Sequence, residues 1–209
     1  MSVFNKIAYF QKRRDDAPNI ELAKELAKSK NRKGIQEIAE NLYNKNKNIQ
    51  SDCIKVLYEI GYINPELIAD YVDDFLKFLK SKNNRMVWGA MTGLSTVAEI
   101  KAEKIWEHID EVIAAVRHGS TTTVAAGVKT LARVASVNER YNEKIFPLLI
   151  EHLKKCNPRN VPMYAESISC TINEGNEKEF LSVLESRKDE MKASQRTRLK
   201  KVLKKLDTQ

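Results

Sequence analysis

The chain is poor in residues that break or cross-link a fold, since its 209 residues include only seven glycines, five prolines and three cysteines. So few glycines and prolines argue against long flexible linkers. The cysteines are odd in number and show no Cys-x-x-Cys spacing, so we expect reduced structural thiols. Alternating β-branched runs and Asn-Gly turns, the usual signals of strands and hairpins, do not occur.

Motifs for catalysis and membrane insertion are missing as well. The chain has no phosphate-binding glycine loop, no dinucleotide-binding motif, no Gly-x-Ser-x-Gly and no His-Glu-x-x-His. His152 and Cys156 are spaced like two metal ligands on a helix, but no second pair matches them. No apolar run reaches the roughly 18–20 residues of a membrane helix, and the N-terminus lacks a signal-peptide core. We therefore predict a cytoplasmic protein without catalytic residues, metal, cofactor or membrane insertion.

A repeat of 37 residues is the strongest positive feature, and it is clearest in four apolar residues: Leu57, Leu94, Leu131 and Ile168. A period in this range is typical of a solenoid, in which each unit buries its apolar face only against its neighbours. Within each unit, apolar residues recur every three or four positions, as on one face of a helix. First helices are predicted to begin near Pro65, Ala102 and Asn142. Second helices are predicted near 47–62, 83–99, 120–137, 160–173 and 193–206.

Antiparallel helix pairs of this length, stacked at this period, resemble HEAT or armadillo-type repeats over residues 34–206. The resemblance implies an all-α fold, a right-handed α-α superhelix (solenoid) of about five antiparallel helix pairs. Residues 1–33 are less regular. There, the apolar residues of 4–10 and 20–26 predict two amphipathic helices that cap the stack. We expect residues 1–209 to form a single HEAT-like repeat domain.

The net charge of +8 belongs mainly to the two ends of the chain. Residues 1–47 carry 11 basic and 6 acidic groups and residues 176–209 carry 10 and 6, whereas residues 48–119 carry 8 and 11. Within the repeats, the first helices hold acidic clusters and the second helices are neutral or basic. The HEAT resemblance implies that second helices line the concave surface, so the basic residues are expected to face the groove.

Removing the core positions from the second helices leaves a strip that is expected to face this groove. Arginine offers planar donors for phosphate or carboxylate, and tryptophan offers a flat face for a ring or a cation. The alternative for Trp88 is packing between repeats. The nearby Gly89 and Gly93 have two interpretations: they leave the backbone approachable and the groove open, or they allow close contact between helices. The predicted partner- or anion-binding strip consists of Asn84, Arg85, Trp88, Thr122, Lys129, Arg133 and Arg159.

Two basic segments have alternative interpretations. Residues 196–206 predict an amphipathic helix with six basic residues, which can bind nucleic acid or an anionic membrane. Alternatively it is the last repeat helix, with its apolar side docked and its lysines solvated. The same alternatives apply to the cluster Lys12-Arg13-Arg14.

A run of hydroxyls, Ser120-Thr121-Thr122-Thr123, predicts a capped helix start, because a hydroxyl there can accept from free backbone N–H groups.

One HEAT-like family, the DNA alkylation repair glycosylases, holds damaged DNA with a tryptophan, an aspartate one turn later and an arginine from the next repeat. Trp88 and Arg133 resemble the tryptophan and the arginine of this family, but Thr92 occupies the position of the aspartate. We therefore predict a non-enzymatic helical-repeat scaffold that binds a protein or an acidic peptide through its concave surface. The first alternative is nucleic-acid binding, which the net acidic middle repeats disfavour, and the second is a glycosylase-like enzyme. The sequence gives no indication of the oligomeric state.

Overall fold

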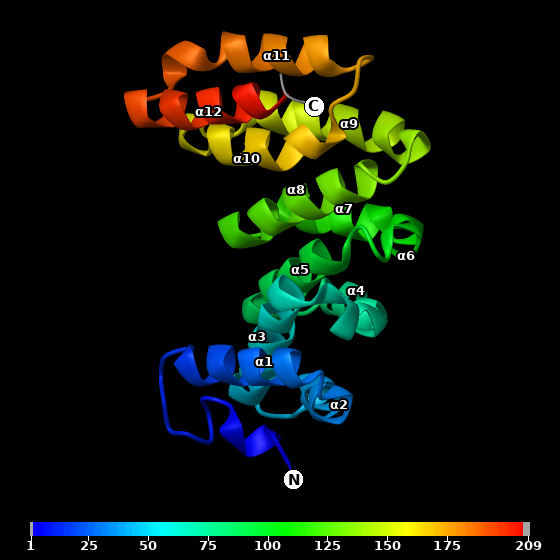
Figure 1. The fold of residues 1–209 in the computed structure, drawn as a ribbon, viewed down its shortest axis with the longest axis vertical. Helices are drawn as coiled ribbons and strands as arrows, with labels where there is room; N and C mark the ends of the chain where they lie inside the picture. The colour runs from blue at the N-terminus through cyan, green and yellow to red at the C-terminus, as the bar shows by residue number, and fades with distance from the viewer. Residues whose placement is uncertain (1, 207–209) are drawn as a thin grey trace. The chain divides into compact units, whose positions relative to one another are not determined.

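The computed structural model of the protein describes residues 2–206, apart from the side chain at position 205. Within this range it consists of twelve α-helices and seven short 3-10 turns, without a strand (Figure 1). The predicted all-α fold is therefore confirmed. Two compact units divide the chain, Met1–Gly127 (unit 1) and Val128–Gln209 (unit 2), and the boundary falls inside helix α8. The expectation that the whole chain acts as one domain stays a prediction.

Unit 1 contains seven complete helices and the start of α8. Helix α3 packs against both α1 and α5, and α5 also packs against α4. We call α1, α3 and α5 the inner layer of unit 1. Helices α3 and α5 are two of the predicted second helices, and α1, which comes earlier in the chain, packs against α3. The helices of this unit are α1 (Ala17–Ser29), α2 (Arg32–Glu40), α3 (Lys47–Ile63), α4 (Val72–Phe78), α5 (Asn84–Val97), α6 (Ala102–Glu107), α7 (Ile109–His118) and α8 (Thr121–Ala135).

The first helices of unit 1 are broken where the sequence predicts continuous ones. Two 3-10 turns, Pro65–Leu67 and Ala69–Tyr71, precede α4, and the Asn64 side chain forms no capping hydrogen bond. Helices α6 and α7 are separated at His108, whose φ of −114° and ψ of 22° leave the helical region. The apolar faces remain buried on both sides of these breaks. Burial of the apolar residues that recur every 37 positions therefore takes precedence over helix continuity.

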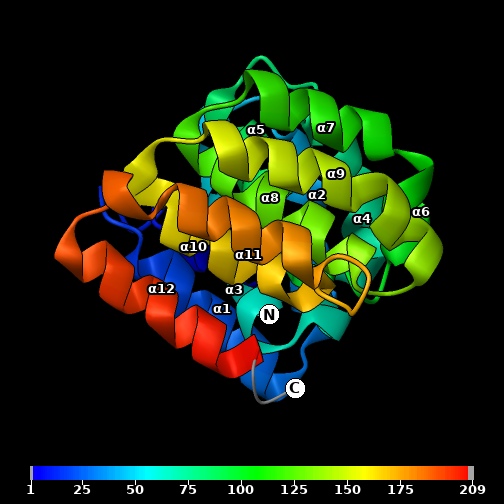
Figure 2. The same ribbon diagram turned by 90° about the horizontal axis from the view of Figure 1, so that it is seen from above.

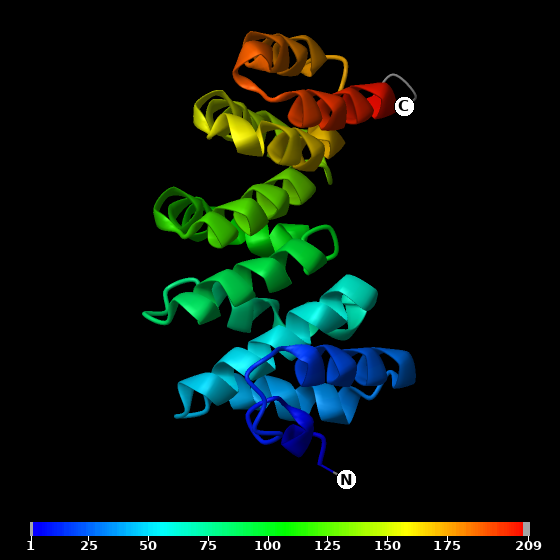
Figure 3. The same cartoon turned by 90° about the vertical axis from the view of Figure 1, so that its left-hand side faces the viewer.

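One of the two predicted N-terminal capping helices is wrong. Residues 20–26 lie in α1 as expected, but residues 4–10 form only a 3-10 turn at Phe4–Lys6. The backbone N–H groups of Ala8 and Tyr9 donate to the side chains of Asn19 and Asp52, at 2.9 and 2.8 Å. Asn19 is fully buried and donates to Asp52 in turn. These side chains replace the bonds of a helix, and the segment folds back beside α1 (Figure 3).

Unit 2 consists of the end of α8 and four further helices in two pairs. Helix α9 packs against α10 and α11, and α10 packs against α12. Helices α11 and α12 lie side by side (Figures 1 and 2). The bounds are α9 (Glu139–Lys155), α10 (Val161–Ile168), α11 (Glu177–Ser186) and α12 (Ala193–Leu206).

A buried arginine joins α11 to the end of α9. Arg187 is only 8% exposed. Its guanidinium donates to the backbone carbonyls of Leu153, Lys154 and Cys156 at 2.8, 2.6 and 2.8 Å, and it pairs with Glu190 at 2.8 Å. The last carbonyls of a helix have no partner within the helix, so this side chain satisfies them and places its positive charge at the negative end of α9.

The repeat predicted from the sequence is confirmed at the level of individual positions. Leu57, Leu94, Leu131 and Ile168 are all buried, and they lie in α3, α5, α8 and α10. The last predicted second helix corresponds to α12. Across residues 2–206, no helix combines the length and the apolar character that crossing a bilayer requires.

Candidate functional site

The seven predicted strip residues fall into two groups. Asn84, Arg85 and Trp88 lie in the first turns of α5, and Thr122 lies in the first turn of α8, all within unit 1. The other three belong to unit 2, where Lys129 and Arg133 lie on α8 and Arg159 lies in the turn before α10. That the two groups form one strip stays a prediction.

Trp88 is half-buried and packs against the preceding inner helix. Its ring centroid lies 5.8 Å from that of Tyr58 on α3, with an angle of 56° between the ring planes. The exposed Arg85 lies on the same side of α5, three residues earlier. Its backbone N–H donates to the Asn83 side chain, which caps the helix. Trp88 therefore packs between repeats and still presents part of its indole to solvent.

Tyr58 connects Trp88 to two further side chains of α3. The Tyr62 ring, 55% exposed, meets the Tyr58 ring edge-on at 6.0 Å, and the Lys55 ammonium lies 4.9 Å from the Tyr58 ring centroid. We call Lys55, Tyr58, Tyr62, Arg85 and Trp88 the α3–α5 aromatic surface. The repeat alignment missed its tyrosines, because Ser and Glu occupy the positions 37 residues later. The spacing of residues 55, 58 and 62 on one helix face was the available signal.

The charge of Lys55 is already compensated. Its ammonium pairs with Glu59 at 2.7 Å and with Asp16 at 3.6 Å. Burial is the largest single influence and would lower the pKa of Lys55, but the interactions with Glu59 and Tyr58 together outweigh it and raise the pKa. Burial also raises the pKa of Tyr58, to about 12, so this phenol stays neutral. Arg85 forms no ion pair with any described residue, which leaves it as the available cation of this surface.

Two glycines of α5 are explained by packing. A Cβ atom at Gly89 would lie 2.9 Å from Ile54 of α3, and one at Gly93 would lie 2.9 Å from the ring of Phe75 on α4. Both distances are too short for ordinary carbon contacts. The glycines therefore allow α5 to approach its neighbours closely, which is the second of the two interpretations that the sequence left open.

The position that a glycosylase would need is occupied by a buried hydroxyl. Thr92 is 6% exposed, and its Oγ1 donates to the backbone carbonyl of Trp88 at 2.7 Å. No carboxylate replaces it one turn after Trp88. The likeness to DNA alkylation repair glycosylases is therefore not supported.

Asn84 and Thr122 contribute to other parts of unit 1. Asn84 lines a cleft of about 510 Å³ together with residues of α7, among them Asp110 and Glu111. The hydrogen bond to Lys80 lowers the pKa of Glu111, so this carboxylate stays ionised and is paired with Lys80 at 2.9 Å. Thr122 is exposed in the first turn of α8, where the neighbouring Ser120 provides the cap by accepting from the Thr123 N–H at 3.3 Å.

The three strip residues of unit 2 are cations in different environments. Lys129 and Arg133 are half-buried and lie one turn apart on α8. Burial lowers the pKa of Lys129, and the charge of Arg133 lowers it further. Arg159 is exposed, and its backbone N–H donates to the Asn157 side chain at 3.0 Å.

Nothing in the part of the chain that the structure describes groups three or more metal-binding side chains. His152 instead contacts the ring of Tyr164, with centroids 4.6 Å apart, and its Nε2 is buried without a hydrogen-bond partner. Burial lowers the pKa of His152. The Cys156 thiol donates to the Leu153 carbonyl. The pair that the sequence spaces like metal ligands is therefore explained by packing.

Neither a protein-family model nor a curated protein matches the chain. Solved structures do. A designed armadillo repeat protein in complex with the peptide (KR)4 is 14% identical, covers 88% of this chain and 85% of its own, and superposes with a TM-score of 0.65. An engineered protein, also 14% identical with a TM-score of 0.65, covers all of both chains. A mutant of Kap121p is 14% identical, covers 95% of this chain but only 22% of its own, and gives 0.68. At such identities the likeness concerns the fold, and it confirms an armadillo-like helical repeat.

Proposed function

We propose that the protein is a non-enzymatic scaffold that binds a protein or peptide partner through the concave surface of its inner helices. The α3–α5 aromatic surface is the observation that carries this proposal. Two neighbouring inner helices together present Trp88, Tyr62 and Arg85 to solvent. Tryptophan, tyrosine and arginine are the residues that most often dominate binding energy at protein interfaces.

The fold supports a binding role because stacked helices form a preformed surface that loses little entropy when a partner docks. The designed armadillo repeat protein to which the chain is similar is in complex with a peptide. In this chain the partner is an acidic segment. Lys55 is neutralised by Glu59, whereas Arg85 is exposed beside Trp88 and available to a carboxylate.

Nucleic acid is the second candidate partner, and α12 is the observation that favours it. This helix exposes a row of basic side chains, of which Arg198 is paired with Glu166 at 2.5 Å. Phosphates would bind such a row mainly by charge, with a strong dependence on salt concentration.

The test is a titration of the protein into fluorescein-labelled probes, followed by anisotropy at about 50 and 200 mM salt. The probes are an alternating Asp-Glu octapeptide, the peptide (KR)4, and single- and double-stranded oligonucleotides. The key variant is Arg85→Ala/Trp88→Ala. Its matched control is Trp106→Ala/Arg117→Ala, which removes the other tryptophan and an exposed arginine from α6 and α7 of the same unit.

We expect the acidic peptide to bind the native protein and the control, and to bind the key variant at least roughly tenfold more weakly. Equal binding to both double variants would remove the α3–α5 aromatic surface from the proposal. Oligonucleotide binding that persists at the higher salt and disappears in the key variant would replace the peptide by nucleic acid at the α3–α5 aromatic surface, whereas oligonucleotide binding that both double variants retain and that the higher salt weakens would favour α12. Circular dichroism melting of each variant separates a lost contact from a lost fold.

A further inference from the structure

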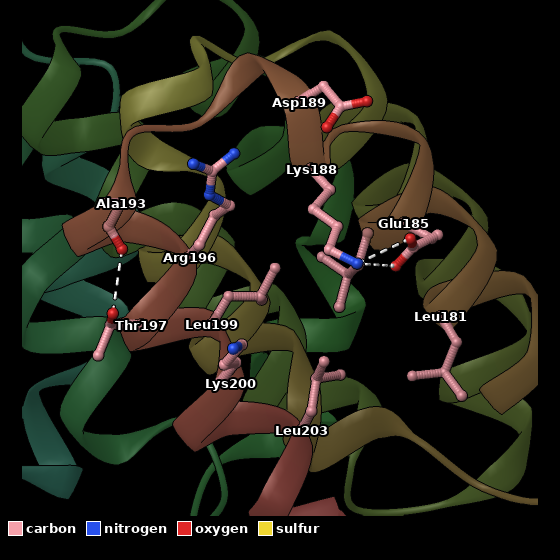
Figure 4. Close-up of a pocket in the computed structure, with 11 residues that line it drawn as sticks. Leu181, Glu185, Lys188, Asp189, Ala193, Arg196, Thr197, Leu199, Lys200 and Leu203 are labelled. Carbon is pink, nitrogen blue, oxygen red and sulfur yellow. Dashed lines mark hydrogen bonds and ion pairs between the residues drawn. The ribbon is translucent and has the colours of Figure 1, made fainter.

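A groove between α11 and α12 is a second candidate surface, distinct from the predicted strip. It has a volume of about 640 Å³ and is lined by side chains of both helices (Figure 4). Leu184 and Leu199 are buried along it, whereas Leu181 remains 39% exposed and Leu203 is half-buried. The groove therefore has an apolar lining that solvent still reaches.

The charges along the two walls differ. On the α11 side, Lys188 pairs with Glu185 at 2.9 Å, so these two charges cancel (Figure 4). Asp189 also lines the groove on this side and leaves this wall with one negative charge. On the α12 side, Arg196 and Lys200 are exposed and form no ion pair with any described residue. They lie one turn apart on one face of the helix. An anionic group above this wall would therefore meet two uncompensated cations.

The helices of unit 2 indicate what shape fits the groove. Helix α11 packs against α9, and α12 packs against α10. Leu181 and Leu203 remain partly exposed between α11 and α12. An apolar groove between two helices is suited to the apolar face of another helix, with anchors at positions i, i+3, i+4 and i+7.

We infer that this groove binds an amphipathic α-helix of a partner protein. The leucine-rich face of the partner helix lies against Leu181 and Leu203, and acidic residues on its flank pair with Arg196 and Lys200. This contact is independent of the α3–α5 aromatic surface, so either one can fail without the other.

The test uses the full chain and a synthetic amphipathic peptide of about 18 residues, long enough to form a helix on binding. The peptide carries leucines at helical spacing and glutamates on one flank, with a fluorescein label for anisotropy. A second peptide has lysine in place of each glutamate. The protein variants are Leu181→Glu, Leu203→Glu and Arg196→Glu/Lys200→Glu. Leu148→Glu is the matched control, because Leu148 is 36% exposed on α9 of the same unit and lies outside the groove.

We expect the glutamate peptide to bind more tightly than the lysine peptide. Leu181→Glu and Leu203→Glu should each weaken binding roughly tenfold or more, since each removes an apolar contact and adds a like charge. The double charge reversal should weaken it by roughly threefold to tenfold, and Leu148→Glu by less than roughly twofold. Arg85→Ala/Trp88→Ala should leave this binding unchanged.

Three results would overturn the inference. They are equal weakening by Leu148→Glu and Leu181→Glu, equal affinity for the glutamate and lysine peptides, and no saturable binding up to about 1 mM peptide. Sedimentation velocity adds a fourth. A dimer that forms with rising protein concentration and is lost in Leu181→Glu would assign the groove to a second copy of the chain.

Discussion

Helix α5 of unit 1 and helix α9 of unit 2 are held to their neighbours by different means. In unit 1, α5 lies so close to α3 and α4 that Gly89 and Gly93 have no room for a side chain. In unit 2, polar side chains join segments that are far apart in the sequence. Arg187 binds the end of α9, and the Asn142 side chain donates to the Thr171 carbonyl at 2.7 Å.

This difference shows which contacts a repeat can supply. The apolar contacts of α5 come from columns that recur every 37 residues, so they follow from the repeat itself. The polar bonds of unit 2 are made by residues without repeated counterparts, and each satisfies a particular buried carbonyl. Removing a repeated apolar residue and removing a polar link should therefore have distinguishable consequences.

The largest effect is expected from Leu94→Ala in α5. Leu94 is fully buried, so truncation should lower the free energy of unfolding by about 2–5 kcal/mol. Leu199→Ala in α12 is the comparison, and it should cost about 1–2 kcal/mol less, because Leu199 lines an open groove into which the structure can relax. Urea unfolding followed by circular dichroism measures both. A greater cost for Leu199→Ala would contradict the idea that the structure relaxes around Leu199 because it lines an open groove.

A smaller effect is expected from Arg187→Ala, about 1–3 kcal/mol, because three backbone carbonyls lose their partner. The control is Arg198→Ala, which breaks an exposed ion pair and should cost about 0–1 kcal/mol. Both tryptophans of the chain, Trp88 and Trp106, lie in unit 1. Indole fluorescence therefore reports on unit 1 and circular dichroism on both units. If the units unfold separately, Arg187→Ala shifts only the dichroism transition, and coincident shifts would show one cooperative block.

The smallest effect concerns pH. Burial lowers the pKa of His152 in the folded protein relative to about 6.5 in the unfolded chain. The unfolded state therefore binds more protons, so stability is complete above about pH 6.5 and falls as the pH drops from there toward the folded-state pKa. We expect His152→Phe to remove part of the loss of stability between about pH 7.5 and 5.5, by roughly 1 kcal/mol or less. Exposed His118 provides the control as His118→Asn, and an equal change there would refute the assignment to His152.

The residues of the α3–α5 aromatic surface were predictable only where they belong to positions that the 37-residue repeat aligns. Arg85 and Trp88 were identified because they lie on the inner helix but outside its core columns, and both are at least partly exposed. Tyr58 and Tyr62 were not, because they do not recur in the next repeat. Arg159 directly precedes the second helix predicted at 160–173, and it lies in the turn before α10. Local spacing assigns a residue to a helix face, but not its neighbour on the next helix.

The sequence by itself determined the second helices, their period and the apolar residues that they bury, because spacing of three and four residues decides which side chains share a helix face. Only the tertiary structure decided that the first residues bind Asn19 and Asp52 instead of forming a helix, and that Arg187 reaches the end of α9. The physical reason is distance along the chain. Asp52 is 43 residues from Tyr9, and Arg187 is 34 from Leu153, so these hydrogen bonds exist only once the helices have packed.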